Sequence, residues 1–290
     1  FIPFEKMSPK PDIIIYQHPW YVETSQGPVV CSKFALTYYV PYYISDIDNP
    51  IEYDLRFHRY IYKYYVPDEI IRKNYAPNMY DKGEKLIIAG HPQLDFYLYN
   101  KNEKEQKYVI YAPHWTVCGE NLRYSTFDWN GYEILEFAEK HSELNWVFKP
   151  HPCLYNFLLK SGYMSKNDAD EYYRRWHEIG VVCEDGDYMQ LFQQSRAMIT
   201  DCGSFLTEYF FTKQPCIHLV SEYFNGNENV NKICETYYNV HNLEEMNKVF
   251  EEVLIKKNDK KKQERLELLE SLNYPNSAEI IVEDLAKVLF

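Results

Sequence analysis

The chain has 290 residues, a formal net charge of −12 and 46% hydrophobic residues. The acidic balance argues against general affinity for nucleic acid, because such affinity requires a basic surface. No apolar run approaches the roughly 20 residues that span a bilayer, so we expect a globular protein of one large domain or two modest ones. The seven cysteines show no metal-type spacing such as C-x-x-C, which indicates reduced thiols and a cytoplasmic location.

The first 95 residues contain few candidate strands. Runs of β-prone residues predict strands at 12–16, 29–30, 35–40 and 86–89. Helices are expected at 56–65, ending before Pro67, and at 68–75. These strands are too few for a complete amino-terminal Rossmann-like domain, and the chain has no initiator methionine. We therefore expect that this half is incomplete and that a first strand or two of the natural protein is missing.

From residue 107 onward, strand and helix patterns alternate. Strands are predicted at 107–112, 146–149, 181–183, 197–200 and 215–219. Helices are predicted at 129–141, 169–179, 205–211, 242–254 and 260–272, with Asp187 as the cap of a further helix. This alternation predicts an α/β domain built on a parallel sheet. The charged stretch 101–106 is the expected crossover, which places the first domain at 1–104 and the second at 105–290.

A tight polar turn follows the strand predicted at 197–200. Backbone N–H groups at a helix N-terminus bind anions, most often phosphate. Gly203 allows a ligand to approach the backbone, and Ser204 can cap the helix and offer a hydroxyl. Glu208 lies one helical turn after Ser204 on the same face. The pattern fits phosphate at the turn and ribose hydroxyls at the carboxylate, although an ordinary capped helix explains these residues equally well.

A second polar segment ends the strand predicted at 146–149. The sequence Lys149-Pro150-His151-Pro152 stops the strand and stiffens the loop. Open α/β sheets bind their ligands at the carboxyl ends of the strands. Lys149 is therefore placed to meet phosphate charge, and His151 to donate to it or to move a proton. A purely structural bond from His151 to a backbone carbonyl is the alternative.

Five segments follow one another in a characteristic order: Gly90-His91-Pro92-Gln93-Leu94-Asp95, Tyr111-Ala112-Pro113-His114-Trp115, Lys149-Pro150-His151-Pro152, Asp187-Tyr188 and Thr200-Asp201-Cys202-Gly203-Ser204. Their order and spacing resemble the CDP-glycerol glycerophosphotransferase family of teichoic-acid and capsule polymerases, over roughly residues 85–220. The resemblance implies a GT-B-like α/β fold of two Rossmann-like halves with parallel sheets. It also implies an enzyme that transfers a polyol phosphate from a CDP-linked donor to a hydroxyl of a cell-surface polysaccharide or teichoic-acid-like acceptor, releasing CMP.

The chain also departs from the family pattern. His114-Trp115 replaces a Thr-aromatic pair, Cys202-Gly203 replaces Tyr-Ser, and Gln93 stands where many members have Arg. Asp95 is expected to cap the turn after its Gly-His-Pro segment. These departures leave the exact donor and acceptor open.

The resemblance and the turn together imply roles for a set of donor-binding residues. The groups expected to bind or support the CDP-glycerol-type donor are Lys149, Thr200, Asp201, Gly203, Ser204 and Glu208. Among them, Thr200, Gly203 and Ser204 would hold the pyrophosphate, and Lys149 would supply electrostatic support. Glu208 would bind ribose and Asp201 would brace the turn. His151 would donate to the phosphate and stabilise the leaving group.

The catalytic base is expected to be a histidine. Teichoic-acid members carry a Trp-His-Gly after an amino-terminal strand, and the nearest counterpart here is His18. His114 is the second candidate, because it follows a strand that ends at the same sheet edge. No Asp-x-Asp stands where a metal-dependent sugar transferase would need it, so neither a metal nor a cofactor is expected.

Two other functions remain open at this point. A GT-B glycosyltransferase with a nucleotide-sugar donor would use the same turn and basic groups. A non-catalytic nucleotide- or polymer-binding module is the other alternative. The basic run 256–262 reads as a solvated helix face and linker, with contact to an anionic polymer or peripheral association with the inner membrane as alternatives.

Overall fold

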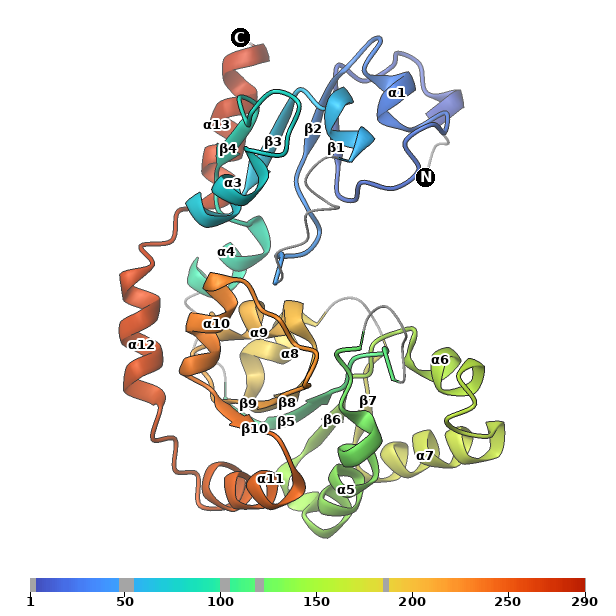
Figure 1. Ribbon diagram of the computed structural model, residues 1–290, viewed down its shortest axis with the longest axis vertical. Helices are drawn as coiled ribbons and strands as arrows, with labels where there is room; N and C mark the ends of the chain where they lie inside the picture. Colours follow the sequence, from blue (N-terminus) through green and yellow to red (C-terminus); the bar gives the residue numbers. More distant parts are fainter. Residues whose placement is uncertain (1–3, 47–54, 100–104, 118–122, 185–187, 290) are drawn as a thin grey trace. The chain divides into compact units, whose positions relative to one another are not determined.

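The computed structural model describes residues 4–46, 55–99, 105–117, 123–184 and 188–289 (Figure 1). The chain divides into two compact units, one formed by Phe1–Phe96 with Tyr274–Phe290 and the other by Tyr97–Asn273. This division differs from the predicted one, which placed a boundary after residue 104 and assigned the last 17 residues to the second domain. Residues 101–104 of the predicted crossover, and Asp187, lie outside the described residues.

The first unit is built on a parallel sheet of four strands in the order β1-β2-β3-β4. The strands are β1 (Ile13–Tyr16), β2 (Leu36–Tyr39), β3 (Lys63–Val66) and β4 (Leu86–Ile88). The helices that begin in this unit are α1 (Pro28–Cys31), α3 (Glu69–Tyr75), α4 (Pro92–Tyr99) and α13 (Ser277–Leu289), with short 3₁₀ turns at Phe4–Lys6 and Arg56–Tyr60. Aromatic rings dominate one core of the unit, where Tyr39 lies 4.9 Å from Phe57 and 4.6 Å from Tyr64 between ring centroids.

Two predicted elements of this unit are wrong. Residues 29–30 belong to α1 and not to a strand, since Pro28 opens a helical turn there. Residues 56–65 are not one helix, because the 3₁₀ turn ends at Tyr60 and β3 follows. Tyr64, Tyr65 and Val66 are all buried between β2 and β4, and aromatic and β-branched residues favour a strand covered on both faces. The strands predicted at 12–16, 35–40 and 86–89 are confirmed.

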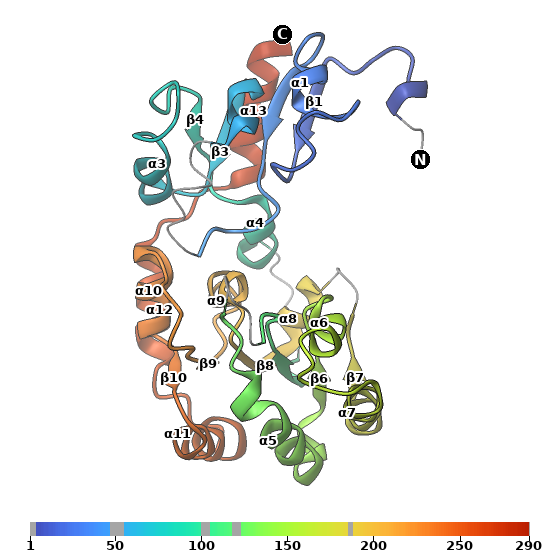
Figure 2. The ribbon, with the colours of Figure 1, turned by 45° about the vertical axis from the view of Figure 1, so that its right-hand side comes forward.

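The carboxyl-terminal helix α13 completes the first unit by packing on its sheet (Figures 1 and 2). Asp95 in α4 caps α13, since its two carboxylate oxygens accept from the backbone N–H groups of Ser277 (3.0 Å) and Ala278 (2.7 Å). The prediction that Asp95 caps its own turn is therefore wrong. Gly90 sits at φ +76°, and a Cβ there would lie 2.4 Å from the Ser277 hydroxyl. The Gly-His-Pro segment and Asp95 thus dock the end of the chain.

The second unit contains a parallel sheet of six strands in the order β10-β9-β8-β5-β6-β7. These strands are β5 (Tyr108–Ala112), β6 (Trp146–Phe148), β7 (Val181–Val182), β8 (Ser195–Thr200), β9 (Cys216–Leu219) and β10 (Tyr238–Val240). The helices are α5 (Phe127–Lys140), α6 (Leu154–Lys160), α7 (Lys166–Ile179), α8 (Met189–Gln194), α9 (Gly203–Phe210), α10 (Glu228–Glu235), α11 (Leu243–Val249) and α12 (Lys262–Ser271). A 3₁₀ turn at Ser142–Leu144 and a π-helical segment at Phe250–Ile255 complete it. The predicted parallel sheet is confirmed.

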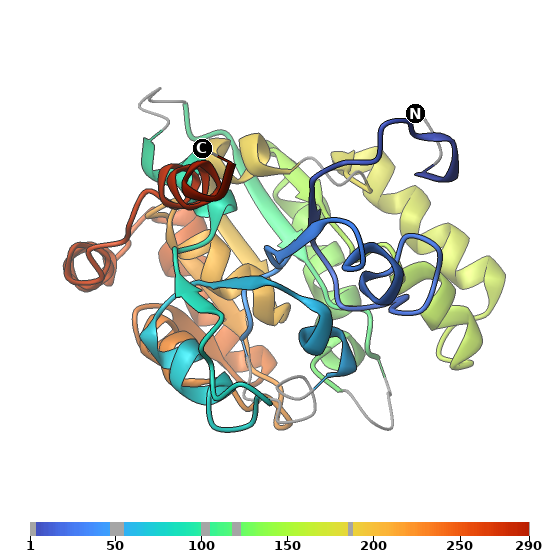
Figure 3. The ribbon, with the colours of Figure 1, turned by 90° about the horizontal axis from the view of Figure 1, so that it is seen from above.

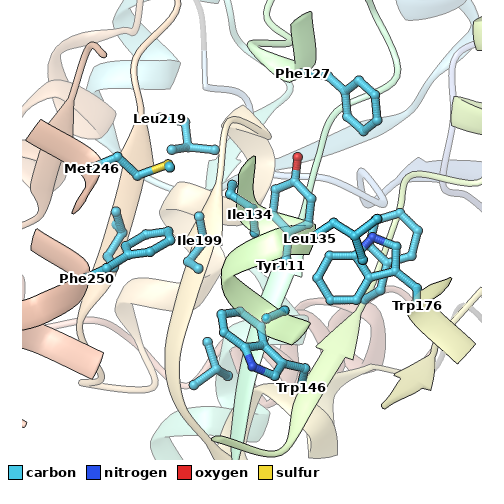
Figure 4. Close-up of a cluster of buried hydrophobic side chains, with 14 of the residues drawn as sticks. Tyr111, Phe127, Ile134, Leu135, Trp146, Trp176, Ile199, Leu219, Met246 and Phe250 are labelled. Carbon is cyan, nitrogen blue, oxygen red and sulfur yellow. The ribbon is translucent and has the colours of Figure 1, made fainter. Parts of the chain in front are cut away.

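Helices cover both faces of this sheet. On one face, α5, α7 and α11 bury a continuous apolar cluster, part of which is shown in Figure 4. Within it the rings of Phe148 and Trp176 stack at 4.9 Å between centroids. On the other face, Tyr209 of α9 bonds Ser195 of β8 (2.7 Å between hydroxyl oxygens). Alternate strand residues therefore face different helix layers, which explains why these strands are almost continuously apolar.

Helix α12, which Figure 3 views almost along its axis, is held to the second unit by one buried cation. Arg265 is fully buried and donates to the carbonyls of Lys213 (3.1 Å) and Thr236 (3.2 Å) and to the Asp259 carboxylate. None of the helices in the described part of the chain combines the length and apolar character that a membrane span requires.

Replacing Asp95 with Ala should destabilise the first unit by about 1–2 kcal/mol, because two N–H groups at the start of α13 lose a charged acceptor. Native-state hydrogen exchange of the α13 amides and urea unfolding measure this loss. Glu283→Ala serves as the matched control, since it removes an exposed carboxylate from the same helix. Equal effects of the two substitutions would contradict the capping role.

Candidate active site

The strands that carry the candidate site end side by side. Ala112 of β5 pairs with Thr200 of β8, and Tyr111 pairs with Phe148 of β6. The chain runs outward from β5 through β6 to β7 and then returns to β8 on the other side of β5. Such a reversal of strand order opens a crevice at the carboxyl ends of the strands, where doubly wound sheets bind ligands.

The buried carboxylate of Asp201 joins three segments at this edge. One oxygen accepts from the backbone N–H of His114 (2.6 Å), and the other accepts from the N–H (2.6 Å) and hydroxyl (2.9 Å) of Thr126. Burial raises the pKa of Asp201 to about 6, and the bonds from Thr126 and His114 oppose that rise. The turn after β8 is thereby fixed to the loop after β5 and to the start of α5.

Thr200 also has a structural task. Its hydroxyl donates to the carbonyl of Ala112 (2.7 Å) and accepts from the N–H of Cys202 (3.0 Å). Since the single hydroxyl proton already serves Ala112, Thr200 is not placed to donate to a pyrophosphate as the sequence predicted. It holds the first residues of the turn in position instead.

Helix α9 begins directly after this turn. Cys202 is its N-cap and provides no side-chain cap, so the prediction that Ser204 caps the helix is wrong. Ser204 occupies the second helical position, and its hydroxyl lies 3.6 Å from the sulfur of Cys202. Among the described residues, the N–H groups of Gly203 and Ser204 have no hydrogen-bond acceptor. Two donors and the positive end of the helix dipole therefore point out of the strand edge.

The hydrogen bonds around His114 define its neutral form. The Thr116 hydroxyl accepts from the N–H groups of Tyr124 (2.9 Å) and Ser125 (3.2 Å), which fills its two lone pairs. Its proton is then directed to Nδ1 of His114, 2.8 Å away. Nδ1 is consequently an acceptor, and the ring carries its proton on Nε2.

His151 has the same arrangement. Its Nδ1 accepts from the backbone N–H of Cys153 (3.1 Å), which again places the proton on Nε2. The backbone N–H of His151 donates to the carbonyl of Pro113 (3.2 Å), and this bond connects the loop after β6 to the loop after β5. The rings of His114 and His151 lie 5.5 Å apart between centroids. Two histidines from neighbouring strand ends thus form a pair.

Both rings are neutral near pH 7. Burial, followed by the charge of His151, lowers the pKa of His114 to about 3. Burial, followed by the charge of Lys149, lowers the pKa of His151 to about 4. A neutral ring that carries its proton on Nε2 donates there and does not accept. In this tautomer Nε2 of His114 carries a proton and can donate, whereas a base would need that atom to be unprotonated. The role of His114 as a base stays a prediction.

A chain of polar contacts links Lys149 to α9. Lys149 is buried, and its ammonium lies 4.9 Å from the centroid of the Tyr188 ring. Tyr188 donates to one oxygen of Glu208 (2.8 Å), and Tyr97 donates to the other (2.6 Å). Sequence reasoning placed Lys149 and Glu208 in one site and included Tyr188 among the family motifs, but it assigned Tyr188 no role and missed Tyr97.

The remaining predicted residue, His18, belongs to the first unit. It follows β1, is exposed, and its ring lies 5.8 Å from that of Tyr21. Its role as the base stays a prediction. In the described ranges, no three His, Cys, Asp or Glu side chains gather as metal ligands would.

A cavity of about 280 Å³ opens at the same sheet edge, between the start of α5 and the end of β9. It is lined by charged, hydroxyl and aromatic side chains that include Arg123, Thr126, Asp128, Trp129, Glu222 and Tyr223. Thr126 connects this cavity to the turn, because the same residue bonds Asp201. The guanidinium of Arg123 lies 5.0 Å above the Tyr223 ring.

Comparison with known protein families gives a match over residues 51–229, more than half of the chain. The matching family is described as CDP-Glycerol:Poly(glycerophosphate) glycerophosphotransferase. The chain belongs to this family. The motifs on which the resemblance was based lie between Gly90 and Ser204, inside the matched range. The family resemblance inferred from the sequence is therefore confirmed. A search of curated protein sequences finds no significant match.

Solved structures share the fold at low sequence identity. The wall teichoic acid polymerase TagF, in a variant soaked with CDPG, is 13% identical with a TM-score of 0.58 over 97% of this chain and 75% of its own. The UDP-GlcNAc 2-epimerase of Methanocaldococcus jannaschii is 17% identical with a TM-score of 0.52 over 96% and 77%. MnaA of S. aureus, solved with UDP, is 13% identical with a TM-score of 0.54 over 96% and 74%. These neighbours confirm the predicted GT-B-like α/β fold.

The buried, neutral His114 should make stability depend on pH. Below pH 6.5 the unfolded chain binds a proton at this ring that the folded chain takes up only near pH 3, so stability is full above pH 6.5 and falls on acidification. Between pH 7 and 5 the loss from this ring amounts to about 2 kcal/mol. In His114→Asn, which keeps an acceptor for Thr116, the pH 7-to-5 difference measured by urea unfolding should shrink by that amount. The exposed His177→Asn variant is the control, and equal pH profiles of both variants would refute the assignment.

Proposed function

We propose that this protein transfers glycerol phosphate, or a related polyol phosphate, from a CDP-linked donor to a hydroxyl of a polysaccharide or teichoic-acid-like acceptor. The observation that carries the proposal is the convergence of the His114–His151 pair and the Gly203 and Ser204 amides at adjoining strand ends. Family membership supports a transferase of this class. The proposal includes a cytoplasmic location, with peripheral contact to the membrane face where such polymers grow.

In the proposed reaction, the acceptor oxygen attacks the phosphorus that bears the polyol. A new oxygen–phosphorus bond forms, and the bond between that phosphorus and the bridging oxygen of CMP breaks. CMP leaves with the bonding electron pair, and the acceptor proton passes to a base, for which His18 is the candidate. Both reactants are anionic, so the site has to neutralise charge and order the two partners.

The described residues suit the donor side of this reaction. The N–H groups of Gly203 and Ser204 would bind the pyrophosphate at the positive end of α9. The Nε2–H groups of His114 and His151 would donate to oxygens that gain charge as CMP leaves, because neutral donors there need no proton exchange. Lys149 would add a positive charge close to these groups.

Glu208 would recognise the ribose of the donor. Each carboxylate oxygen accepts one tyrosine hydroxyl, and carboxylate oxygens are suitable acceptors for ribose hydroxyls. Tyr97 and Tyr188 would hold the carboxylate in a fixed orientation for that contact. The cavity beside Thr126 has carboxylates and an aromatic surface, which suit the hydroxyls and carbon skeleton of a polyol.

Product analysis separates this proposal from the other functions. Transfer of a polyol phosphate releases CMP, whereas a glycosyltransferase would release a nucleoside diphosphate from its nucleotide sugar. Incubated with CDP-glycerol and a teichoic-acid-like acceptor, the protein should form CMP, and UDP-sugars should yield no UDP. Formation of a nucleoside diphosphate would establish the glycosyltransferase instead. Binding of CDP without any product would leave a non-catalytic module.

His151→Asn tests the donor role in the same assay. The Asn side chain keeps an acceptor for the backbone N–H of Cys153, so the loop should keep its conformation. The Nε2–H donor is lost. CMP release should fall by about 10²–10³-fold, the usual cost of removing one preorganised donor. CDP affinity, measured by calorimetry, should change little. Wild-type turnover in this variant would remove His151 from the chemistry.

A further inference from the structure

A basic pocket lies at the opposite edge of the second sheet. It has a volume of about 460 Å³, and its lining includes Arg196, Lys213, Pro215, Lys257 and Lys262. Arg196 is the second residue of β8 and Pro215 immediately precedes β9, so the pocket is at the amino ends of the strands. The candidate active site is at their carboxyl ends. Strand β8 alone, with six residues, separates the two edges by roughly 20 Å.

Four cations and one carboxylate line this pocket, and the charge of Glu143 also acts on its Arg196. Asp259 also lines it, but its carboxylate is bonded to Arg265 and accepts from the Tyr238 hydroxyl (3.0 Å). Within the described residues, Lys213, Lys257 and Lys262 have no ion-pair partner.

The neighbouring lysines of the same run behave differently. Lys256 and Lys260 pair with Glu252 at 2.7 and 3.3 Å. Lys261 donates to the backbone carbonyl of Glu235 and does not line the pocket. Lys257 and Lys262 are thus the pocket-lining lysines of this run, and neither has an ion-pair partner among the described residues. In a chain with a net charge of −12, such a local concentration of cations creates a positive potential that attracts anionic ligands.

The number of cations and the concave form of the pocket indicate which kind of anion would bind there. Lysines bind phosphate as flexible point charges, and four cations around one hollow suit a ligand with several phosphates. Arg196 is half-buried and donates to the carbonyl of Leu254 (2.9 Å), so part of the charge lies inside the concavity. A concave site receives a chain segment, whereas a membrane surface would favour a flat or convex basic face.

We propose that this pocket binds a phosphodiester segment of the anionic polymer on which the enzyme acts, remote from the reacting end. This inference rests on the proposed function, since the ligand is the polyol-phosphate acceptor or product. A long polymer reaches both edges of the sheet and gains affinity from the pocket. A short acceptor that occupies the active site cannot span the roughly 20 Å to it.

Two matched triple variants test the pocket. In the first, Lys213, Lys257 and Lys262 are each replaced by Gln; in the second, the ion-paired Lys232, Lys256 and Lys260 are replaced by Gln. Each triple removes three positive charges from exposed positions. Fluorescence anisotropy with labelled poly(glycerol phosphate) should show about tenfold weaker binding in the first triple, the sum of three exposed charge contacts, and little change in the second.

Further readouts separate the pocket from the active site. CDP affinity and turnover with a glycerol phosphate dimer as acceptor should be unchanged in the pocket triple, whereas KM for the long polymer should rise. Equal loss of polymer binding in both triples would overturn the proposal, because general charge would then explain it. Loss of binding to anionic phospholipid vesicles with unchanged polymer binding would overturn it in favour of a membrane. The anisotropy result does not depend on turnover, so it stands or fails separately from the proposed reaction.

Discussion

The candidate site depends on one buried carboxylate. Asp201 stands at the end of β8 and accepts three hydrogen bonds from the loop after β5 and the start of α5. Without these bonds, the backbone N–H groups of His114 and Thr126 would be buried without acceptors, at a cost of about 1–3 kcal/mol each. The same bonds set the position of His114 relative to α9. Structural stability and the geometry of the site therefore share one residue.

The histidine pair derives its chemistry from bonds that are not visible in local sequence. A Thr-Asp turn, a Lys-Pro-His-Pro loop and a strand ending before His114 predicted which side chains share the sheet edge, because parallel strands end together. The direction of each ring could not be predicted in this way. It depends on the Thr116 hydroxyl, whose lone pairs are filled by N–H groups eight and nine residues further along the chain. Similarly, Tyr97 reaches Glu208 from 111 residues away.

The fold, too, could be predicted from local sequence patterns only in part. In the second unit, apolar strands alternate with amphipathic helices, and this pattern predicted a parallel sheet correctly. In the first unit, the Tyr-rich segment 56–65 predicts a helix, but its last residues form β3, because the burial that favours a strand comes from β2 and β4 on either side. The return of α13 to the first sheet was also missed. Its determinants, Asp95 and Asp284, act across large sequence separations on α13 and β3.

The central claim is that two neutral imidazoles donate from Nε2 beside the amides that open α9, and that this arrangement receives the phosphates of a CDP-linked donor. Nitrogen NMR of protein labelled with ¹⁵N in histidine and the backbone tests it most directly. At pH 7 the account predicts that His114 and His151 are neutral with the proton on Nε2, and that CDP shifts both signals together with the amides of Gly203 and Ser204. Positively charged rings, or CDP-induced shifts confined to other parts of the chain, would contradict it.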